Sequence, residues 1–272
     1  RIGHSVFALP FALVGALLAA QEHLVTPMRV AWIVVAMVLA RTAAMGFNRI
    51  VDVRYDALNP RTANRELPRG AISSRDAVIL VVVASIGFVL VTTRLGLVCF
   101  LLSPVALAIV FWYSLAKRYT AYTQLFLGLA LAVAPVGGWL AAGGRGGWAP
   151  WLLALATGAW VAGFDILYAC QDLEFDRRQG LRSIPERFGV RTSLVIARWL
   201  HVATVLALAG VALVAPLGVW YLLGVVGVAT MLAYEQSLVA ADDLSRVKQA
   251  FDLNGYVGLF YLAATAGALY VG

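Results

Sequence analysis

One short stretch of the chain places three oxygen-bearing side chains at four-residue spacing, just where a long apolar run ends. They are Asn48, Asp52 and Asp56. Because four residues make about one helical turn, we expect the three side chains on one face of a helix end. Carboxylates beside an apolar segment are costly unless they are neutralised, and their oxygens are ligands that Mg²⁺ prefers. The stretch therefore predicts a divalent-cation site.

A second acidic stretch, with Asp172 and Asp176 at the same spacing, ends another apolar run. Asp165 lies seven residues before Asp172, as Arg41 lies seven residues before Asn48. In an ideal helix, residues at offsets of seven and then four fall within about 40° of one another. Arg41, Asn48 and Asp52 would therefore share one helix face. Asp165, Asp172 and Asp176 would share a face of another helix. The carboxylates of the two stretches would repel each other across one space. We therefore expect Mg²⁺ ions between the stretches to neutralise them.

Arg41 and Asp165 both lie about two turns inside their apolar runs. An ionisable side chain at that depth faces the interior of a helix bundle or a watery cavity. The two residues either pair with each other to hold helices together or take part in the chemistry. Pairing would not exclude a role in the chemistry, so both interpretations stay open.

Basic side chains accompany the acidic stretches. Arg61, Arg65, Lys117, Arg118 and Arg182 lie in the adjoining loops and suit the oxygens of a diphosphate. For any one of them, the alternative is that it serves membrane topology alone. Carboxylates, cations and an apolar surrounding together suggest a lipid diphosphate. Its polar head would lie at the rim of the bundle, with its tail among the helices.

The chain that carries these residues is 62% hydrophobic and 13% charged over 272 residues. A soluble domain carries about twice that charged fraction. The apolar runs are about 16 to 24 residues long, which suffices to cross a bilayer as helices. We expect an all-α, multi-pass transmembrane bundle of about nine helices that forms a single domain, 1–272. The expected spans are 5–20, 28–47, 77–92, 95–113, 124–142, 148–171, 193–213, 217–240 and 254–271. No small-residue cleavage site follows the first run, so we expect a first span and not a removed signal peptide.

The connections between the runs alternate in charge. The basic side comprises 48–76, 114–123, 172–192 and 241–253. The other side carries only Arg29, Arg94 and Arg145. By the positive-inside rule the basic side is cytoplasmic, which puts the N-terminus inside and the site at the cytoplasmic surface. A C-terminus outside then requires an odd number of spans, in agreement with nine.

The net charge of +7 follows from this topology and from attraction to anionic lipid of the bilayer. A nucleic-acid partner would need a basic face on a soluble domain, so none is expected, and no feature predicts a protein partner. The two cysteines form no CxxC pair, which argues against a disulfide framework and a cysteine metal site.

The motifs resemble those of the UbiA family of intramembrane aromatic prenyltransferases. The first family signature, NxxxDxxxD, is met by Asn48, Asp52 and Asp56, and the second Asp-rich motif by Asp172 and Asp176, with Asp165 at a further family aspartate. The segment 59–70 is similar to the first cytoplasmic loop of the family, and 113–120 to the end of its fourth helix. The resemblance covers the whole chain in order and includes a nine-helix layout.

The resemblance implies a mechanism. Two Mg²⁺ ions would bridge the Asp motifs and the diphosphate of a polyprenyl donor, and Asp52, Asp172 and Asp165 would be catalytic residues. Lys117, Arg118 and Arg61 would stabilise the departing diphosphate, and an electron-rich phenol would attack the allylic cation. Asp165 would orient or deprotonate the acceptor, and Arg41 would bind the acceptor carboxylate or the diphosphate. Arg182 would bind the diphosphate. His4 lies at a position that is basic in some relatives.

Three segments, 4–11, 47–52 and 163–172, are similar to menaquinone prenyltransferases of the futalosine route, and the same segments also resemble 4-hydroxybenzoate polyprenyltransferases. This resemblance implies a bacterial inner-membrane enzyme of quinone biosynthesis. It favours 1,4-dihydroxy-6-naphthoate as the aromatic acid acceptor, with 4-hydroxybenzoate a close second. A secondary transporter is a rival, since it could also place charges at mid-membrane, but it would not need paired Asp motifs among basic loops. The run typical of CDP-alcohol phosphotransferases does not occur.

Overall fold

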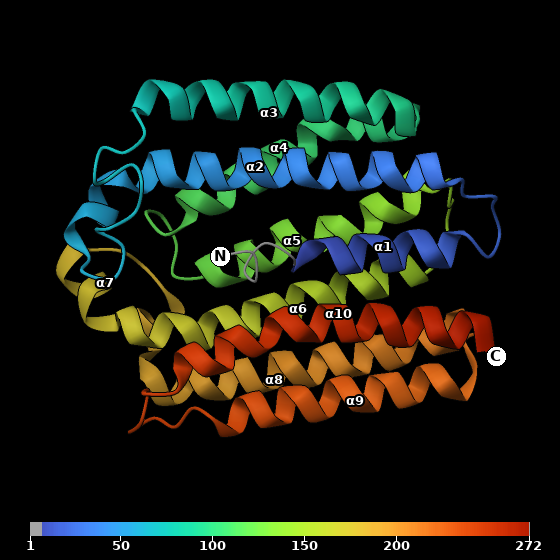
Figure 1. Ribbon diagram of the computed structural model, residues 1–272. Coiled ribbons are helices and arrows are strands. Elements are labelled where there is room, and N and C mark those ends of the chain that lie inside the picture. Colours follow the sequence, from blue (N-terminus) through green and yellow to red (C-terminus); the bar gives the residue numbers. More distant parts are fainter. Residues whose placement is uncertain (1–6, 272) are drawn as a thin grey trace.

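The computed structural model describes residues 7–271, and Figure 1 shows them as long helices that run side by side. The main helices are α1 (Ala8–Ala19), α2 (Pro27–Leu58), α3 (Ser74–Leu95), α4 (Leu97–Ala116), α5 (Thr123–Ala141), α6 (Ala149–Ala169), α8 (Ile184–Val214), α9 (Gly218–Ser237) and α10 (Val247–Val271). A 3-10 turn (Cys170–Asp172) and the short helix α7 (Leu173–Gln179) lie between α6 and α8, at one end of the bundle. Within the described residues, the predicted all-α bundle of about nine helices is confirmed.

Seven of the described helices are long and apolar enough to cross a membrane, and α1 is apolar but has 12 residues. Large apolar side chains such as Leu101 and Leu206 point outward, with 62% and 67% of their surface exposed. An outer surface of this kind is suited to lipid, and the chain is an integral membrane protein. His4 and the start of the first predicted span lie outside the described residues.

Several helices extend beyond the predicted spans at the end that carries α7. α2 continues past residue 47 to Leu58, and α8 begins at Ile184, before residue 193, with a non-helical kink at Gly189 between its start and the rest of the helix. Hydropathy detects only the apolar part of a helix, whereas the helix continues until capping ends it. The start of α8 is capped by Ser183, whose Oγ accepts from Glu186 N at 3.3 Å. Asp52 and Asp56 therefore lie inside α2, as the four-residue spacing predicts.

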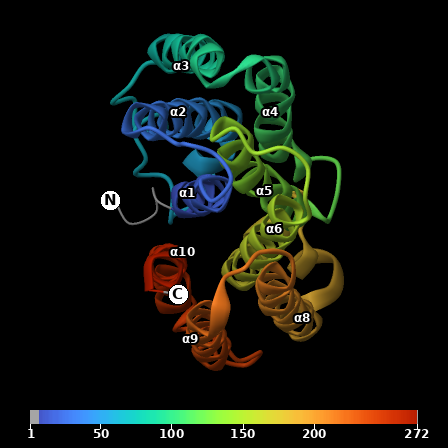
Figure 2. The same cartoon turned by 90° about the vertical axis from the view of Figure 1, so that its right-hand side faces the viewer.

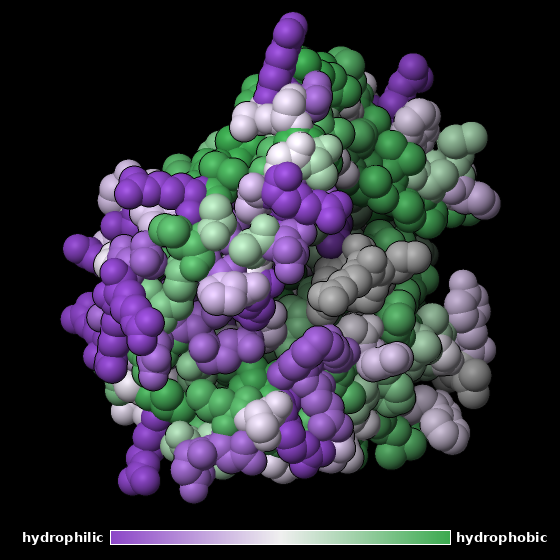
Figure 3. Space-filling model, turned by 60° about the vertical axis from the view of Figure 1, so that its left-hand side comes forward, coloured by the Kyte–Doolittle hydropathy of each residue, from purple (hydrophilic) through white to green (hydrophobic). Residues whose placement is uncertain are grey.

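The loop after α2, the connection from α4 to α5, and α7 gather at the left-hand end of the bundle in Figure 1. Figure 3 brings this end forward and shows hydrophilic residues over it, while apolar surface covers the flank. The loop after α2 and the segment from α7 to α8 both lie on the side predicted to be basic. The helices thus deliver both acidic stretches to one polar end.

Close approaches between helices give the bundle its rigid centre. A Cβ on Gly15 of α1 would clash with the Pro135 carbonyl of α5, and a Cβ on Gly138 would clash with the Ala12 carbonyl. Because lipid tails are as apolar as leucine, tight backbone packing between small residues holds membrane helices together. The end-on view in Figure 2 shows α1 lying against α5, with α6 next to both.

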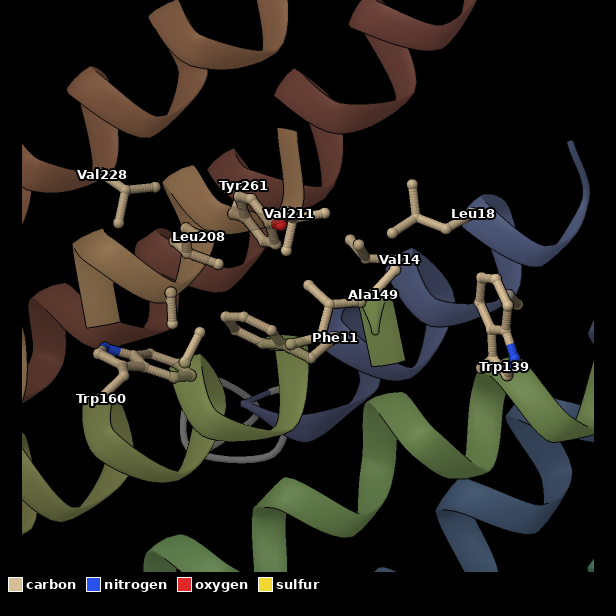
Figure 4. Packing of buried hydrophobic residues seen from close by; sticks show 14 of the residues in the cluster. Phe11, Val14, Leu18, Trp139, Ala149, Trp160, Leu208, Val211, Val228 and Tyr261 are labelled. Carbon is tan, nitrogen blue, oxygen red and sulfur yellow. The ribbon is translucent and has the colours of Figure 1, made fainter. Parts of the chain in front are cut away.

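The aromatic core lies between α1, α6 and α10. The ring of Phe11 is 5.1 Å from that of Trp160 and 5.3 Å from that of Tyr261, centroid to centroid (Figure 4). Trp160 and Leu153 of α6 are fully buried, with 0% of their surface exposed. α6 is therefore held in place by packing on several sides, and so are the acidic residues at its end.

Candidate functional site

A cavity of about 270 Å³ lies at the polar end of the bundle, between α2, α4, α6 and α7. Its lining includes all five predicted metal ligands, namely Asn48, Asp52, Asp56, Asp172 and Asp176. It also includes Asp165 and three of the four predicted diphosphate ligands, namely Arg61, Lys117 and Arg182. Segments more than 100 residues apart in sequence thus contribute to one polar space, as the two acidic stretches predict.

Asp52 is the most enclosed of these carboxylates, with 4% of its surface exposed. Lys117 Nζ lies 2.6 Å from Asp52 Oδ2, and Arg118 Nη2 lies 3.0 Å from Oδ1. Asn48 Nδ2 donates to Oδ2 at 3.3 Å. Arg118 also donates to the carbonyl of Val51 at 2.6 Å, so it ties the end of α4 to α2 as well as neutralising Asp52. Arg118 thus acts on the site by binding Asp52, whereas its own side chain is not part of the cavity lining.

Asp56 lies one turn farther along α2 and has a different partner. Arg65 Nη1 lies 2.7 and 2.8 Å from its two carboxylate oxygens. Arg49 Nη1 is 3.8 Å from Oδ2. Arg65 comes from the loop after α2, which folds back over its own helix. Thr62 of the same loop donates to the Asp56 carbonyl at 3.0 Å.

Asp172 is bound by that same loop. Arg61 Nη2 lies 2.6 Å from Asp172 Oδ2, and Arg61 Nη1 donates to the Tyr168 hydroxyl at 2.8 Å. Burial alone would lower the pKa of Arg61, but the charge of Asp172 and these hydrogen bonds raise it above its ordinary value. Arg61 therefore remains a cation and ties the loop after α2 to the second acidic stretch.

Asp176 and Arg182 complete the far side of the cavity. Ser183 Oγ donates to Asp176 Oδ2 at 3.0 Å. Arg182 Nη1 donates to the Tyr119 carbonyl at 2.7 Å, and its backbone N–H donates to the Lys117 carbonyl at 2.9 Å. These bonds connect the segment after α7 to the end of α4.

The oxygen donors of this cavity fit Mg²⁺, with one difference from the prediction. Each of Asp52, Asp56 and Asp172 has a lysine or arginine partner, so the carboxylates do not depend on metal ions alone for neutralisation. Among the described residues, no group of three histidine, cysteine or acidic side chains could hold a metal ion by itself. Mg²⁺ is usually held by one or two carboxylates together with substrate phosphates, and the separate acidic stretches offer that kind of site.

A second cavity, of about 490 Å³, adjoins the first and is lined by residues of α1 to α6 and of α10. Its lining is mostly apolar, with Arg41 among the exceptions. Asp165 and Tyr113 line both cavities, so they mark the junction between the polar and the apolar space. Arg41 donates to Met45 Sδ at 3.0 and 3.2 Å. The structure therefore places Arg41 and Asp165 around one cavity, as their predicted depth requires.

No role was predicted for Asn59, Tyr113 or Tyr168, yet all three line the polar cavity. Asn59 Nδ2 donates to Asp172 Oδ1 at 3.4 Å. A signal existed for the tyrosines, because Tyr113 lies four residues before Lys117 and Tyr168 lies four before Asp172. A residue one turn away shares the helix face of the polar residue it precedes.

The sequence of this chain is similar to those of known proteins. The model of the UbiA prenyltransferase family matches residues 8–264. A 4-hydroxybenzoate octaprenyltransferase of Aeromonas salmonicida is 34% identical over 226 residues, which cover 83% of this chain and 78% of that protein. That of Citrobacter koseri is 32% identical over 246 residues, with 89% and 84% covered.

Solved structures of similar proteins have the same fold. A UbiA homologue from Aeropyrum pernix K1 superposes with a TM-score of 0.88 at 36% identity, and the match covers 100% of this chain and 98% of that one. A UbiA homologue from Archaeoglobus fulgidus, solved with GPP and Mg²⁺, has a TM-score of 0.72 at 19% identity, with 99% and 98% covered. At that identity the second likeness concerns the fold.

Proposed function

The chain belongs to the UbiA prenyltransferase family, and from this premise we propose that it transfers a polyprenyl chain from a polyprenyl diphosphate to an aromatic carboxylate, with Mg²⁺ as cofactor. That it is a prenyl-transferring enzyme follows from the family. One observation carries the proposal: a cavity with acidic and basic side chains adjoins an apolar cavity, and Asp165 and Tyr113 line both. A substrate with a charged head and an isoprenoid tail is complementary to both spaces.

The donor diphosphate binds in the polar cavity. Asn48, Asp52, Asp56, Asp172 and Asp176 are the residues that would hold Mg²⁺ there. Mg²⁺ would supply charge neutralisation to the diphosphate oxygens. Lys117, Arg61 and Arg182 line the same space and stabilise the negative charge that develops as the allylic C–O bond breaks. Arg118 supports them by holding Asp52 in place.

The reaction is electrophilic substitution on a ring. The C–O bond breaks and its electron pair leaves with the diphosphate. A ring carbon of the phenol then forms a carbon–carbon bond to the allylic carbon and loses its proton. Apolar walls around the second cavity exclude water, which would otherwise capture the cation. Asp165, at the junction, is placed to accept the ring or hydroxyl proton.

The acceptor enters the apolar cavity with its carboxylate toward Arg41. Both candidate acceptors carry a carboxylate, and Arg41 in the lining of that cavity has a guanidinium group that can bind it. The names of the similar proteins favour 4-hydroxybenzoate. The resemblance of 4–11, 47–52 and 163–172 favours 1,4-dihydroxy-6-naphthoate. We take 4-hydroxybenzoate as the first candidate and the naphthoate as the second.

The orientation in the membrane follows from the basic loops. We propose that the polar end faces the cytoplasm at the inner membrane of a bacterium, with the N-terminus inside, because Arg61, Arg65, Lys117 and Arg182 all lie at that end. All helices act as one transmembrane prenyltransferase domain, since residues from α2, α4, α6 and α7 share one cavity.

An acceptor panel tests the proposal. Membranes that contain the protein are given a polyprenyl diphosphate with either 4-hydroxybenzoate or 1,4-dihydroxy-6-naphthoate, with Mg²⁺ or with a chelator. We expect a prenylated aromatic acid only with Mg²⁺, and faster with the benzoate. A protein that binds a solute equally well in chelator and forms no prenylated product would instead be a transporter.

A further inference from the structure

Three buried polar side chains form a hydrogen-bonded chain from α9 through α10 to α6. Asn254 Nδ2 donates to Glu235 Oε1 at 2.7 Å, and Trp160 Nε1 donates to Asn254 Oδ1 at 2.6 Å. All three residues have 0% of their surface exposed. Glu235 Oε2 has no hydrogen-bond partner within the part of the chain that the structure describes. Burying polar side chains in a membrane protein costs free energy, so we expect this hydrogen-bonded network to have a function.

Three phenylalanines near this network, Phe7, Phe164 and Phe251, form a surface that we call the aromatic wall. Each of them lines the apolar cavity. Their ring centroids are 5.3 Å (Phe7–Phe164), 5.7 Å (Phe7–Phe251) and 5.5 Å (Phe164–Phe251) apart. Phe164 directly precedes Asp165 in the sequence. The wall therefore offers aromatic surface beside the junction of the two cavities, and rings pack well against such surfaces.

The polar network supports this wall from behind. The ring of Trp160 meets that of Phe164 edge-on, 5.2 Å apart at 72°, and that of Phe7 at 6.1 Å and 81°. Asn254 lies three residues after Phe251 on α10, so both point toward α6. The Trp160–Asn254 hydrogen bond thus fixes the α6 side of the wall relative to the α10 side.

We infer that the aromatic wall is the surface against which the acceptor ring binds, and that Glu235, Asn254 and Trp160 are positioning residues for it. This inference rests on the proposed prenyl transfer to an aromatic acid. A ring on Phe164 lies beside Asp165 and within the cavity that Arg41 lines. α9 and α10, which contribute none of the predicted metal ligands, then determine how well the acceptor binds.

Phe251→Leu tests the wall. Leucine keeps the apolar character and removes the ring. Since an aromatic pair contributes about 0.5–1.5 kcal/mol, we expect the KM for the aromatic acid to rise roughly 2- to 12-fold, with the KM for the polyprenyl diphosphate unchanged. Phe100→Leu, on α4 and outside the cavity lining, is the matched control and should leave both KM values unchanged.

Three single variants and one double variant test the positioning residues. Trp160→Phe keeps a ring and loses the N–H donor, and Asn254→Leu removes the hydrogen bonds to Trp160 and Glu235 together with one to the Ala250 carbonyl. We expect both to raise the KM for the aromatic acid alone, and the double variant Trp160→Phe/Phe251→Leu to show little more than the Phe251→Leu effect. Glu235→Leu removes the oxygen that accepts from Asn254 and should also raise the KM for the aromatic acid alone. If Asn254→Leu does not fold, Trp160→Phe supplies the same comparison.

The outcomes separate the inference from the proposed function. An active Phe251→Leu variant with an unchanged KM for the aromatic acid, or with both KM values raised alike, overturns the wall. A Trp160→Phe variant that loses thermal stability but keeps its KM for the aromatic acid overturns the positioning role. If the wild-type protein prenylates no aromatic acid, the proposed function itself is wrong.

Discussion

Lys117 Nζ lies 2.6 Å from Asp52 Oδ2, although 65 residues separate the two in sequence. This contact joins the end of α4 to the acidic face of α2. It places a cation beside a carboxylate whose proposed task is to hold Mg²⁺ against a diphosphate. The site thus contains its own counter-charges, and each can be removed separately.

Lys117→Met should impair the donor step. The variant leaves Asp52 with Arg118 and Asn48 as partners, so Mg²⁺ can still bind. It removes a charge that stabilises the departing diphosphate, and we expect kcat to fall roughly 10²-fold or more with a raised KM for the donor. Steady-state kinetics in detergent measures both. Lys248→Met removes an exposed lysine that pairs with Asp252 on α10, and it should retain wild-type kinetics.

Asp165→Asn should separate proton transfer from donor binding. The side chain lies at the junction of the two cavities, where an amide of the same shape can take its place. We expect kcat for the aromatic acid to fall about 10²-fold or more, because general-base catalysis contributes that much. The KM for the donor should not change. An unaltered kcat would remove Asp165 from the mechanism.

Arg65→Leu should lower the stability of the folded protein. Asp56 is buried, and among the described residues the change would leave its carboxylate with the more distant Arg49 as its basic partner. Since Arg65 is partly exposed, we expect the free energy of unfolding to fall by about 1–2 kcal/mol, less than for a fully buried pair. Arg178→Leu breaks the exposed pair with Glu174 and should change it by less than about 0.5 kcal/mol. Equal thermal shifts for the two variants would contradict this account of Asp56.

Gly138→Ala should force α1 and α5 apart. Its Cβ would clash with the Ala12 carbonyl, which belongs to backbone and cannot rotate away. Overpacking of this kind costs about 1–3 kcal/mol, seen as a lower melting temperature in detergent. At the neighbouring Gly137, a Cβ would meet no atom within 4 Å, so Gly137→Ala should be neutral or slightly stabilising. A stable Gly138→Ala variant would show that the contact relaxes easily.

The sequence alone predicts the number and order of the helices because apolar runs of membrane length are a strong signal. It also predicts which acidic residues share a cavity. Asp52 and Asp172 each belong to a stretch with four-residue spacing at the end of an apolar run, and the two stretches are expected to face one space. Helix ends are predicted less well: α2 reaches Leu58 because polar turns continue a helix without any hydropathy signal.

Contacts between distant segments could not be predicted. Arg61 reaches Asp172 and Tyr168 only because the loop after α2 folds across the end of α6. Likewise, Phe251 of α10 lines the apolar cavity because α10 packs against α1 and α6. Local spacing carries no information about such packing, whereas it does place residues on one helix face.

The central claim is that both acidic stretches act together in Mg²⁺-dependent prenyl transfer. Asp52→Asn and Asp172→Asn keep the side-chain shape and remove one charge from each stretch. The decisive measurement is the Mg²⁺-dependent rate of prenylation for each variant in membranes, beside Asp243→Asn in an exposed loop as control. We predict a loss of roughly 10²-fold or more in each of the two variants and the wild-type rate in the control. A folded Asp52→Asn or Asp172→Asn protein that works at the wild-type rate would contradict the claim.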